Sequence, residues 1–264
     1  MGKVMLGEMT WKEVAEAIEG GARVVVIPVG ATEQHGPHLP LLTDTLMVES
    51  AARMAAERAG GVLVAPVIPY GTSDNHIDFP GTASLRLDTL RNLLVDVGRT
   101  LAGHGFDVIV LLNGHGGNTA AIAAAAHELR QVTNKVIAAV PWYAYIKESH
   151  RVMESKISWH ADEFETSLML CMHPERVQMD RAVNEMPRPF PLFEFTHEAL
   201  LSARVDLGLP RTRAVVDSGT FGEARLATAE KGRACVEEAI AGLAGVLKEL
   251  HGKGAEIAKR YTPD

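Results

Sequence analysis

Cysteine and aromatic residues are scarce in this sequence of 264 residues. It contains two cysteines, Cys171 and Cys235, and Phe, Trp and Tyr together make up 5% of the chain. The two cysteines have no paired spacing that would indicate a thiolate metal site or a disulfide framework, so we expect buried thiols in a reducing compartment. Because aromatic residues are few, we expect an aliphatic core.

The sequence also lacks a membrane-spanning hydrophobic run and an excess of basic charge. Residues 1–8 contain no apolar segment of the kind found in a secretory signal. The formal net charge is -7, from 26 Lys and Arg and 33 Asp and Glu. This balance argues against a nucleic-acid surface, which needs a concentrated basic footprint. We therefore expect a cytoplasmic protein that acts on a small molecule, with neither nucleic acid nor membrane as a partner.

The hydrophobic periodicity predicts strands and helices in alternation. Length permits one large domain or two smaller ones, and we favour a single domain over residues 1–264. A Thr10–Glu13 capping box opens the first helix, Gly20-Gly21 closes it, and Asp88 is expected to cap the third. Strands are predicted over 23–29, 62–68, 107–112 and 135–140, and further helices over 44–59, 88–103, 119–132, 162–172 and 223–250.

This order of elements predicts an α/β fold. Strands separated by helices of this length form right-handed crossovers, which give a parallel sheet covered on both faces. In such sheets the ligand crevice lies beyond the carboxyl ends of the strands. The loops that begin at Gly30, Pro69, Asn113 and Pro141 should therefore meet there.

The first of these loops carries Glu33, His35 and, at its end, Asp44. Carboxylates and imidazoles are the ligands that suit Zn, Mn or Fe, and a carboxylate between two histidines is able to bridge two ions. Glu33 and His35 are two apart, so in extended backbone they project to the same side. Alternatively, Glu33 and His35 hydrogen-bond the loop in place, and Asp44 caps the following helix.

The second cluster is Asn113-Gly-His115-Gly-Gly-Asn118, between a predicted strand and a predicted helix. Glycines on both sides of His115 leave room to present the imidazole in a sharp turn. Glycine-rich turns before helices also bind phosphate, but the spacing fits neither the dinucleotide fingerprint nor a phosphate loop.

Two further stretches carry candidate residues. His160, Asp162, Glu163 and Glu165 lie at the start of a predicted helix; a cap at Asp162 and dipole effects of the glutamates account for the acids but not for His160. Ser73, His76 and Asp78 follow the second strand, where substrate contacts and Asx turns are equal alternatives. The proline-rich stretch 186–193 fits a lid, a subunit contact or a plain surface loop.

Taken together, these motifs resemble the creatininase (creatinine amidohydrolase) family. The resemblance runs in order from about residue 5 to 250. It depends on Gly-Ala-Thr-Glu33-Gln-His35-Gly-Pro-His-Leu-Pro, Thr-Asp44, Phe79-Pro-Gly-Thr, Asn-Gly-His115-Gly-Gly-Asn, His160-Ala-Asp-Glu163-Phe-Glu-Thr-Ser and Ala-Thr-Ala-Glu-Lys-Gly232. It implies a three-layer α/β/α fold, a centre of two divalent ions, Zn, Mn or Fe with Zn favoured, and a homohexamer.

The resemblance also implies a ligand set. Glu33, Asp44 and His115 would hold one ion and His35 and Asp44 the other, with Asp44 bridging. In creatininase proper the position of Gly117 is a glutamate ligand and that of Gly116 an aromatic residue that meets substrate. We expect Glu163 to supply the missing carboxylate, as in the branch of the family with a Gly-His-Gly-Gly-Asn motif, and we keep Gly116 as a substrate contact.

The expected function is metal-dependent hydrolysis of a C–N bond in a small cyclic amide, amidine or formamide. A metal-bound hydroxide would attack the carbonyl, with His160 and Glu163 transferring protons and Ser73 and His76 contacting substrate. Related branches include formamide deformylases, a peptidase of the mycofactocin pathway and hydrolases of sugar-derived ketones. The alternatives are hydrolysis of a C–C bond in a cyclic diketone or sugar-derived ketone, and a non-catalytic sensor that needs no metal.

Overall fold

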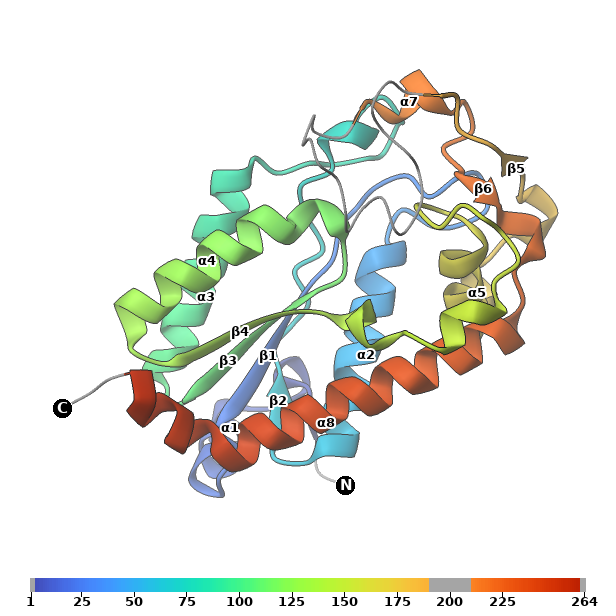
Figure 1. The fold of residues 1–264 in the computed structure, drawn as a ribbon. Coiled ribbons are helices and arrows are strands. Elements are labelled where there is room, and N and C mark those ends of the chain that lie inside the picture. The colour runs from blue at the N-terminus through green and yellow to red at the C-terminus, as the bar shows by residue number, and fades with distance from the viewer. Residues whose placement is uncertain (1–2, 190–209, 262–264) are drawn as a thin grey trace.

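The computed structural model describes residues 3–189 and 210–261 and shows alternating strands and helices (Figure 1). The helices are α1 (Trp11–Glu19), α2 (Thr43–Ala59), α3 (Leu87–Gly103), α4 (Thr119–Thr133), α5 (Glu163–Met172), α7 (Thr212–Val215) and α8 (Ala229–Tyr261). The strands are β1 (Val24–Val29), β2 (Val62–Val64), β3 (Val108–Asn113), β4 (Val136–Pro141), β5 (Asn184–Glu185) and β6 (Gly222–Glu223).

The central sheet has four parallel strands in the order β2-β1-β3-β4. Val24 of β1 is in register with Val62 on one side and with Val108 on the other, and Val108 is in register with Val136. Every residue of β1 and of β3 is buried, as expected for central strands of a sheet covered on both faces.

Alternate residues of the strands face two different layers of helices. Val24 and Val26 belong to one apolar cluster together with residues of α2 and α8. Val25 and Ile27 belong to a second cluster with residues of α3 and α4. Figure 1 shows α3 and α4 on one side of the sheet and α2 and α8 on the other. The predicted three-layer α/β/α fold with an aliphatic core is confirmed.

Most element boundaries lie within one residue of the sequence prediction, and the larger differences are the end of β2 and both ends of the last helix, which runs on to Tyr261 rather than to residue 250. β2 ends at Val64, and Ile68 keeps only an isolated bridge to Val29. The last helix begins at Ala229, after Thr228 accepts a hydrogen bond from the Lys231 N–H at 3.2 Å. The Asp88 side chain does not cap α3, which begins at Leu87 and carries Asp88 in its first turn.

The proline-rich stretch 186–193 lies partly outside the described residues, which stop at residue 189 and resume at 210. Just before it, β5 pairs antiparallel with β6, so residue 184 lies opposite residue 223. The prediction of a lid or a subunit contact for this stretch stays a prediction.

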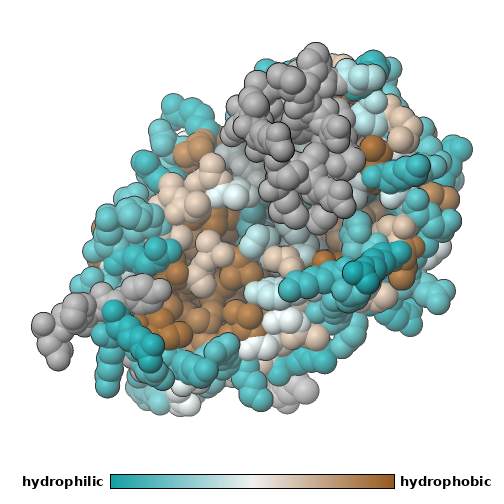
Figure 2. All heavy atoms as spheres, in the orientation of Figure 1, coloured by the Kyte–Doolittle hydropathy of each residue, from teal (hydrophilic) through white to brown (hydrophobic). Residues whose placement is uncertain are grey.

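No helix within the described ranges is both long enough and apolar enough to span a bilayer. One face does carry apolar side chains: Figure 2 shows them over β4, between α4 and α8. β4 is the last strand in the order of the sheet, and Ala139 on it is exposed.

Candidate metal centre

Residues from several distant segments meet at the carboxyl edge of the sheet. Glu33 and His35 follow β1, His76 follows β2 and His115 follows β3, while Asp44 lies in the first turn of α2. These residues therefore meet where the parallel strands end, as predicted.

Asp44 is the centre of this group. Its Oδ1 lies 3.3 Å from Nε2 of His35, and its Oδ2 lies 3.1 Å from Nδ1 of His115. His115 also reaches Glu33, with Nε2 3.2 Å from Oε2. The alternative role of Asp44 as a helix cap is not observed, because the N-cap of α2 is Leu42 and no side chain caps it. The structure brings all four predicted residues together.

Several ligand-type atoms of this group are buried without a hydrogen-bond partner. These atoms are both carboxylate oxygens of Glu33, Nε2 of His35 and Oδ2 of Asp44. Buried polar atoms are normally satisfied, and orphaned acceptors that face one another indicate a cation site. Glu33, His35 and Asp44 place one ligand atom each within 4.8 Å of one another. The donor set therefore fits a divalent ion.

Main-chain carbonyls orient two of the imidazoles. Nδ1 of His35 lies 3.2 Å from the Glu33 carbonyl oxygen, and Nε2 of His115 lies 3.0 Å from that of Thr72. An N–H donated to a carbonyl leaves the other ring nitrogen free as a ligand atom. In both residues the free nitrogen is the one that faces Asp44.

The structure does not bring Glu163 to this group, in contrast to the sequence expectation. Its Oε1 accepts a hydrogen bond from Lys231, and its Oε2 accepts from the N–H groups of Glu154 and Ser155. The carboxylate nearest the cluster from this helix is instead Glu165, whose Oε2 lies 3.8 Å from Nε2 of His35. The two glutamates are two apart at the start of α5, so they point in different directions.

His160 lies beside the cluster, as predicted. Its Nδ1 is 3.6 Å from Oε1 of Glu33 and 4.0 Å from Oε2 of Glu165. Its ring is 4.3 Å from that of His35 and 4.2 Å from that of His76, measured between centroids. Ala161 has a positive φ of 49°, and its N–H donates to Glu165 at 2.6 Å. Glu165 thus holds the turn that presents His160.

The three predicted substrate contacts also surround the cluster. Ser73 is fully buried, with an Oγ that has no hydrogen-bond partner. His76 is buried, and its Nε2 lies 3.6 Å from Oε1 of Glu33. Gly116 is exposed at the start of a 3-10 turn, next to the partly exposed His115. The cluster therefore approaches solvent on the side of His115.

The nearby carboxylates raise the pKa values of two imidazoles of the cluster. Burial opposes protonation of His35, but Asp44, Glu165 and Glu33 outweigh it and raise its pKa to about 10. Burial also opposes protonation of His115, whose pKa rises to about 9 through Glu33 and Asp44. Protons thus occupy the places in which a cation would neutralise the carboxylates.

Burial shifts the pKa values of two neighbours of the cluster so that their neutral forms are favoured. Burial, together with His35, His115 and His76, holds the pKa of His160 well below its ordinary value. The pKa of Glu165 rises to about 8, because burial and the nearby Asp44 and Asp162 outweigh the attraction of His35. Strongly shifted groups gathered in one cluster are typical of a catalytic site.

Sequence reasoning gave no role to three residues that the structure places at the site. Glu165 received only a helix-dipole role, because the sequence alone does not show which glutamate faces the crevice. Gln34 contacts both His76 and His160, at 2.8 and 2.9 Å. Thr212 lies 3.0 Å from Nδ1 of His76; no local pattern links residues so far apart in sequence.

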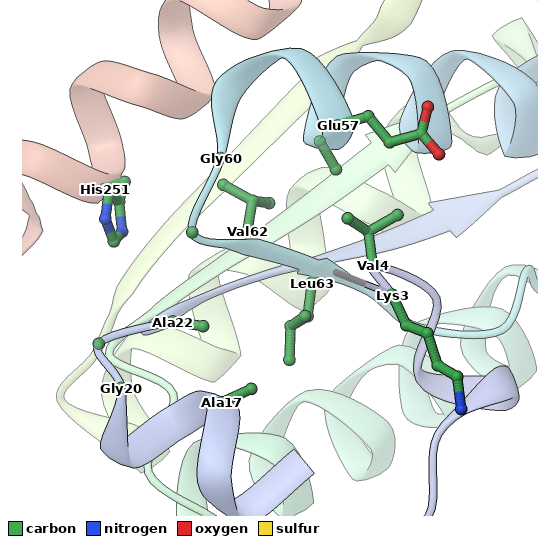
Figure 3. A pocket seen from close by; sticks show the side chains of 13 residues that line it. Lys3, Val4, Ala17, Gly20, Ala22, Glu57, Gly60, Val62, Leu63 and His251 are labelled. Atoms are coloured by element: carbon green, nitrogen blue, oxygen red, sulfur yellow. The ribbon is translucent and has the colours of Figure 1, made fainter. Parts of the chain in front are cut away.

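A separate pocket lies at the opposite edge of the sheet, between the ends of α1 and α2 (Figure 3). Its volume is about 390 Å³. It is lined mainly by glycines and small apolar side chains, with Lys3, Glu57 and His251 among them. None of the cluster residues lines it. This pocket is therefore separate from the cluster at the carboxyl edge.

The three-layer fold and the buried carboxylate and imidazole cluster at the carboxyl edge of its sheet place this chain among α/β proteins with a candidate metal centre. The family model described as creatinine amidohydrolase (creatininase) matches residues 7–247. The chain belongs to the creatininase family and is a hydrolase.

Three characterised relatives differ in their reactions. A creatinine amidohydrolase of Pseudomonas putida is 34% identical and covers 93% of this chain and 96% of its own length. A mycofactocin precursor peptide peptidase of Mycolicibacterium smegmatis is 36% identical, with coverage of 85% and 84%. A 3-dehydro-scyllo-inosose hydrolase of Thermotoga maritima is 29% identical, with coverage of 92% and 82%. The family therefore does not fix the substrate.

Solved structures of the family match the fold closely. A manganese form of creatininase superposes with a TM-score of 0.80 at 32% identity, covering 94% of this chain and 98% of the other. A mutant creatininase of Zn-Zn type gives a TM-score of 0.79 at 32% identity with the same coverage.

Proposed function

We propose that this chain is a metal-dependent amidohydrolase that cleaves a C–N bond of a small cyclic amide, amidine or formamide. The observation that carries the proposal is the buried set of orphaned ligand atoms around Asp44. Family membership and the manganese and zinc forms of creatininase support divalent metal binding.

The proposed ligands are Glu33, His35, Asp44, His115 and Glu165, for two ions, with zinc favoured and manganese or iron as alternatives. Asp44 directs one oxygen to each of two imidazoles, as a bridging carboxylate would. Glu165 replaces Glu163 in this set. Gly117 cannot carry a ligand, and a Cβ there would collide with the Thr72 carbonyl oxygen and with the His115 ring.

The side chains around the ligands have separate roles in the proposed hydrolysis. Divalent ions, when bound, polarise a carbonyl and lower the pKa of water to roughly 7. Water oxygen bonds to the carbonyl carbon while a water proton passes to Nδ1 of His160, and as the C–N bond breaks His160 returns that proton to the departing nitrogen. The unpaired hydroxyl of Ser73 would donate to substrate, while His76 and Gly116 line its binding site.

A second candidate reaction is hydrolysis of a C–C bond in a cyclic diketone or sugar-derived ketone at the same centre. The relative described as 3-dehydro-scyllo-inosose hydrolase favours it. In this reaction the leaving group is a carbanion, so His160 would protonate carbon rather than nitrogen.

Elemental analysis of the purified protein tests the metal-dependent proposal. We expect up to two equivalents of zinc, manganese or iron per chain, and a loss of at least half of this metal in the His115→Ala variant. The matched control is His127→Ala, on the outer face of α4, which should keep the full complement. Equal metal content in all three proteins would contradict the proposal and favour a non-catalytic sensor.

Product mass spectrometry separates the two reactions. Incubation with a panel of lactams, formamides and cyclic diketones should give a product heavier by one water, or two fragments, from a C–N substrate. Turnover confined to diketones would establish the second reaction instead.

We also propose that the chain forms a homo-oligomer, a hexamer by family resemblance, in the cytoplasm. The apolar area over β4 supports self-association (Figure 2). Cys171 and Cys235 are both free, which fits a reducing compartment.

A further inference from the structure

The side-chain amide of Gln34 is buried, and two main-chain groups fix its orientation. The Gly36 N–H donates to Oε1 of Gln34 at 2.9 Å, and Nε2 of Gln34 donates to the Gly219 carbonyl oxygen at 3.2 Å. If the amide were flipped, its oxygen would face the carbonyl oxygen of Gly219 and its NH₂ group would face the N–H of Gly36, and neither contact would be a hydrogen bond. Because the main chain carries one obligatory acceptor and one obligatory donor here, only one orientation satisfies both.

This orientation determines which nitrogen of His76 carries the proton. One amide proton of Gln34 goes to Gly219, and the other points to Nδ1 of His76 at 2.8 Å. Nδ1 must therefore accept. A neutral imidazole that accepts at Nδ1 carries its proton on Nε2, and Nε2 of His76 faces Oε1 of Glu33 at 3.6 Å.

His160 turns its other ring nitrogen, the unprotonated one, toward the cluster. Its Nε2 lies 2.7 Å from the main-chain oxygen of Gln34, which can only accept. The proton of His160 is therefore on Nε2, and Nδ1 presents a lone pair toward Glu33 and Glu165. The amide nitrogen of Gln34, 2.9 Å from the same Nε2, has both its protons directed elsewhere.

We propose that Gln34 is a positioning residue that gives the two stacked imidazoles opposite functions. His76 points an N–H toward the carboxylate of Glu33, and His160 presents a lone pair able to accept a proton or a cation. Distances alone would allow Glu33, His76 and His160 to hold an ion together. The hydrogen bond to Nδ1 excludes His76 from this set, because its nitrogen facing Glu33 is protonated.

The inference deepens the proposed function and is tested without turnover. The probe is the zinc-loaded protein with ¹⁵N-labelled histidine, observed by long-range ¹H–¹⁵N correlation of the ring nitrogens, with His76→Gln and His160→Gln used for assignment. In the wild type we expect protonated Nε2 and unprotonated Nδ1 at both His76 and His160. A proton on Nδ1 of either ring would overturn the proposal.

The Gln34→Glu variant makes the test specific. Glutamate keeps an acceptor for the Gly36 N–H but replaces the donor that faces His76, so the His76 proton should move to Nδ1. His160 should keep its proton on Nε2, because its partner is main chain. The matched control Gln131→Glu, beside the exposed His127, should leave both rings unchanged.

A Gln34→Glu spectrum in which His76 keeps its wild-type tautomer would also overturn the proposal. If the variant does not fold, the wild-type spectrum alone decides. Zinc is measured in the same samples by elemental analysis, so absence of metal contradicts the proposed function while the ring tautomers still decide this inference.

Discussion

Glu163 and Glu165 illustrate how neighbouring residues of the same type acquire different roles. Glu163 is buried and Glu165 is partly buried. Glu163 forms an ion pair with Lys231, which itself lies in the first turn of α8. Glu165 faces His35 and His160 and holds the turn at Ala161. The first residue thus fastens α5 to α8, while the second contributes to the site.

The matched variants Glu163→Gln and Glu165→Gln should therefore separate stability from metal binding. Glu165→Gln removes a charged ligand and should weaken zinc affinity by at least about 10-fold. Glu163→Gln removes one partner of a buried ion pair and should lower the free energy of unfolding by about 1–3 kcal/mol with metal content unchanged. Zinc titrations and denaturant unfolding of both variants provide the measurement. Loss of zinc from the Glu163 variant alone would reverse the assignment.

The titration of the cluster predicts how metal-free protein responds to pH. His35 and His115 have pKa values of about 10 and 9 in the folded chain, above the ordinary value near 6.5. A raised folded-state pKa stabilises the fold below about pH 6.5, and this contribution is lost as the pH rises through 9 to 10. Chelator-treated protein should therefore lose thermal stability between pH 6.5 and 10.

Metal-loaded protein should lose much less stability over the same range, because the cation replaces the protons. Thermal unfolding of both forms at constant ionic strength checks this expectation. Parallel stability profiles for the two forms would contradict it.

At the scale of single residues, the sequence predicted the members of the cluster better than their contacts. Glu33, His35, Asp44 and His115 could be selected because each follows a buried strand or opens a helix at the same edge of the sheet. Choosing between Glu163 and Glu165 was not possible, because the deciding partner, Lys231, lies on another helix.

At the scale of elements, the contact between α5 and α8 sets the position of Glu165. Gly232 in the first turn of α8 lies against the main chain of α5 at Ser167, and a Cβ on Gly232 would collide with the Ser167 carbonyl oxygen. Close approach of the two helices therefore requires glycine at this position.

A matched pair of glycine substitutions in α8 tests this contact. Gly232→Ala should lower the free energy of unfolding by about 1–3 kcal/mol, because the backbone of α5 must shift. Gly245→Ala, where a Cβ would meet nothing within 4 Å, should raise it by about 0.4–1 kcal/mol through helix propensity. Denaturant unfolding of both variants gives the comparison. Equal effects of the two substitutions would show that the helices do not approach closely at Gly232.

The sequence predicted the order and type of the central elements because periodicity and caps are local. It misplaced the end of β2 and the start of α8, where non-local pairing decides. Glu223 was expected to open the last helix but pairs with Asn184 across a two-stranded sheet. No local pattern could show that β6 interrupts the helical periodicity at this point.

At the scale of the whole molecule, the exposed apolar area over β4 predicts self-association (Figure 2). Sedimentation velocity at micromolar concentration should give a species of several chain masses of 28.5 kDa each, six for a hexamer. A single species of one chain mass at all concentrations would contradict a homo-oligomer.

The central claim is that side chains from distant segments form one metal centre at the carboxyl edge of the sheet. Anomalous diffraction from crystals of zinc-loaded protein, recorded above and below the zinc edge, tests it most directly. The account predicts anomalous peaks between Asp44 and the imidazoles of His35 and His115, with Glu165 as a ligand. Peaks located elsewhere, or none at this cluster in fully zinc-loaded crystals, would contradict it.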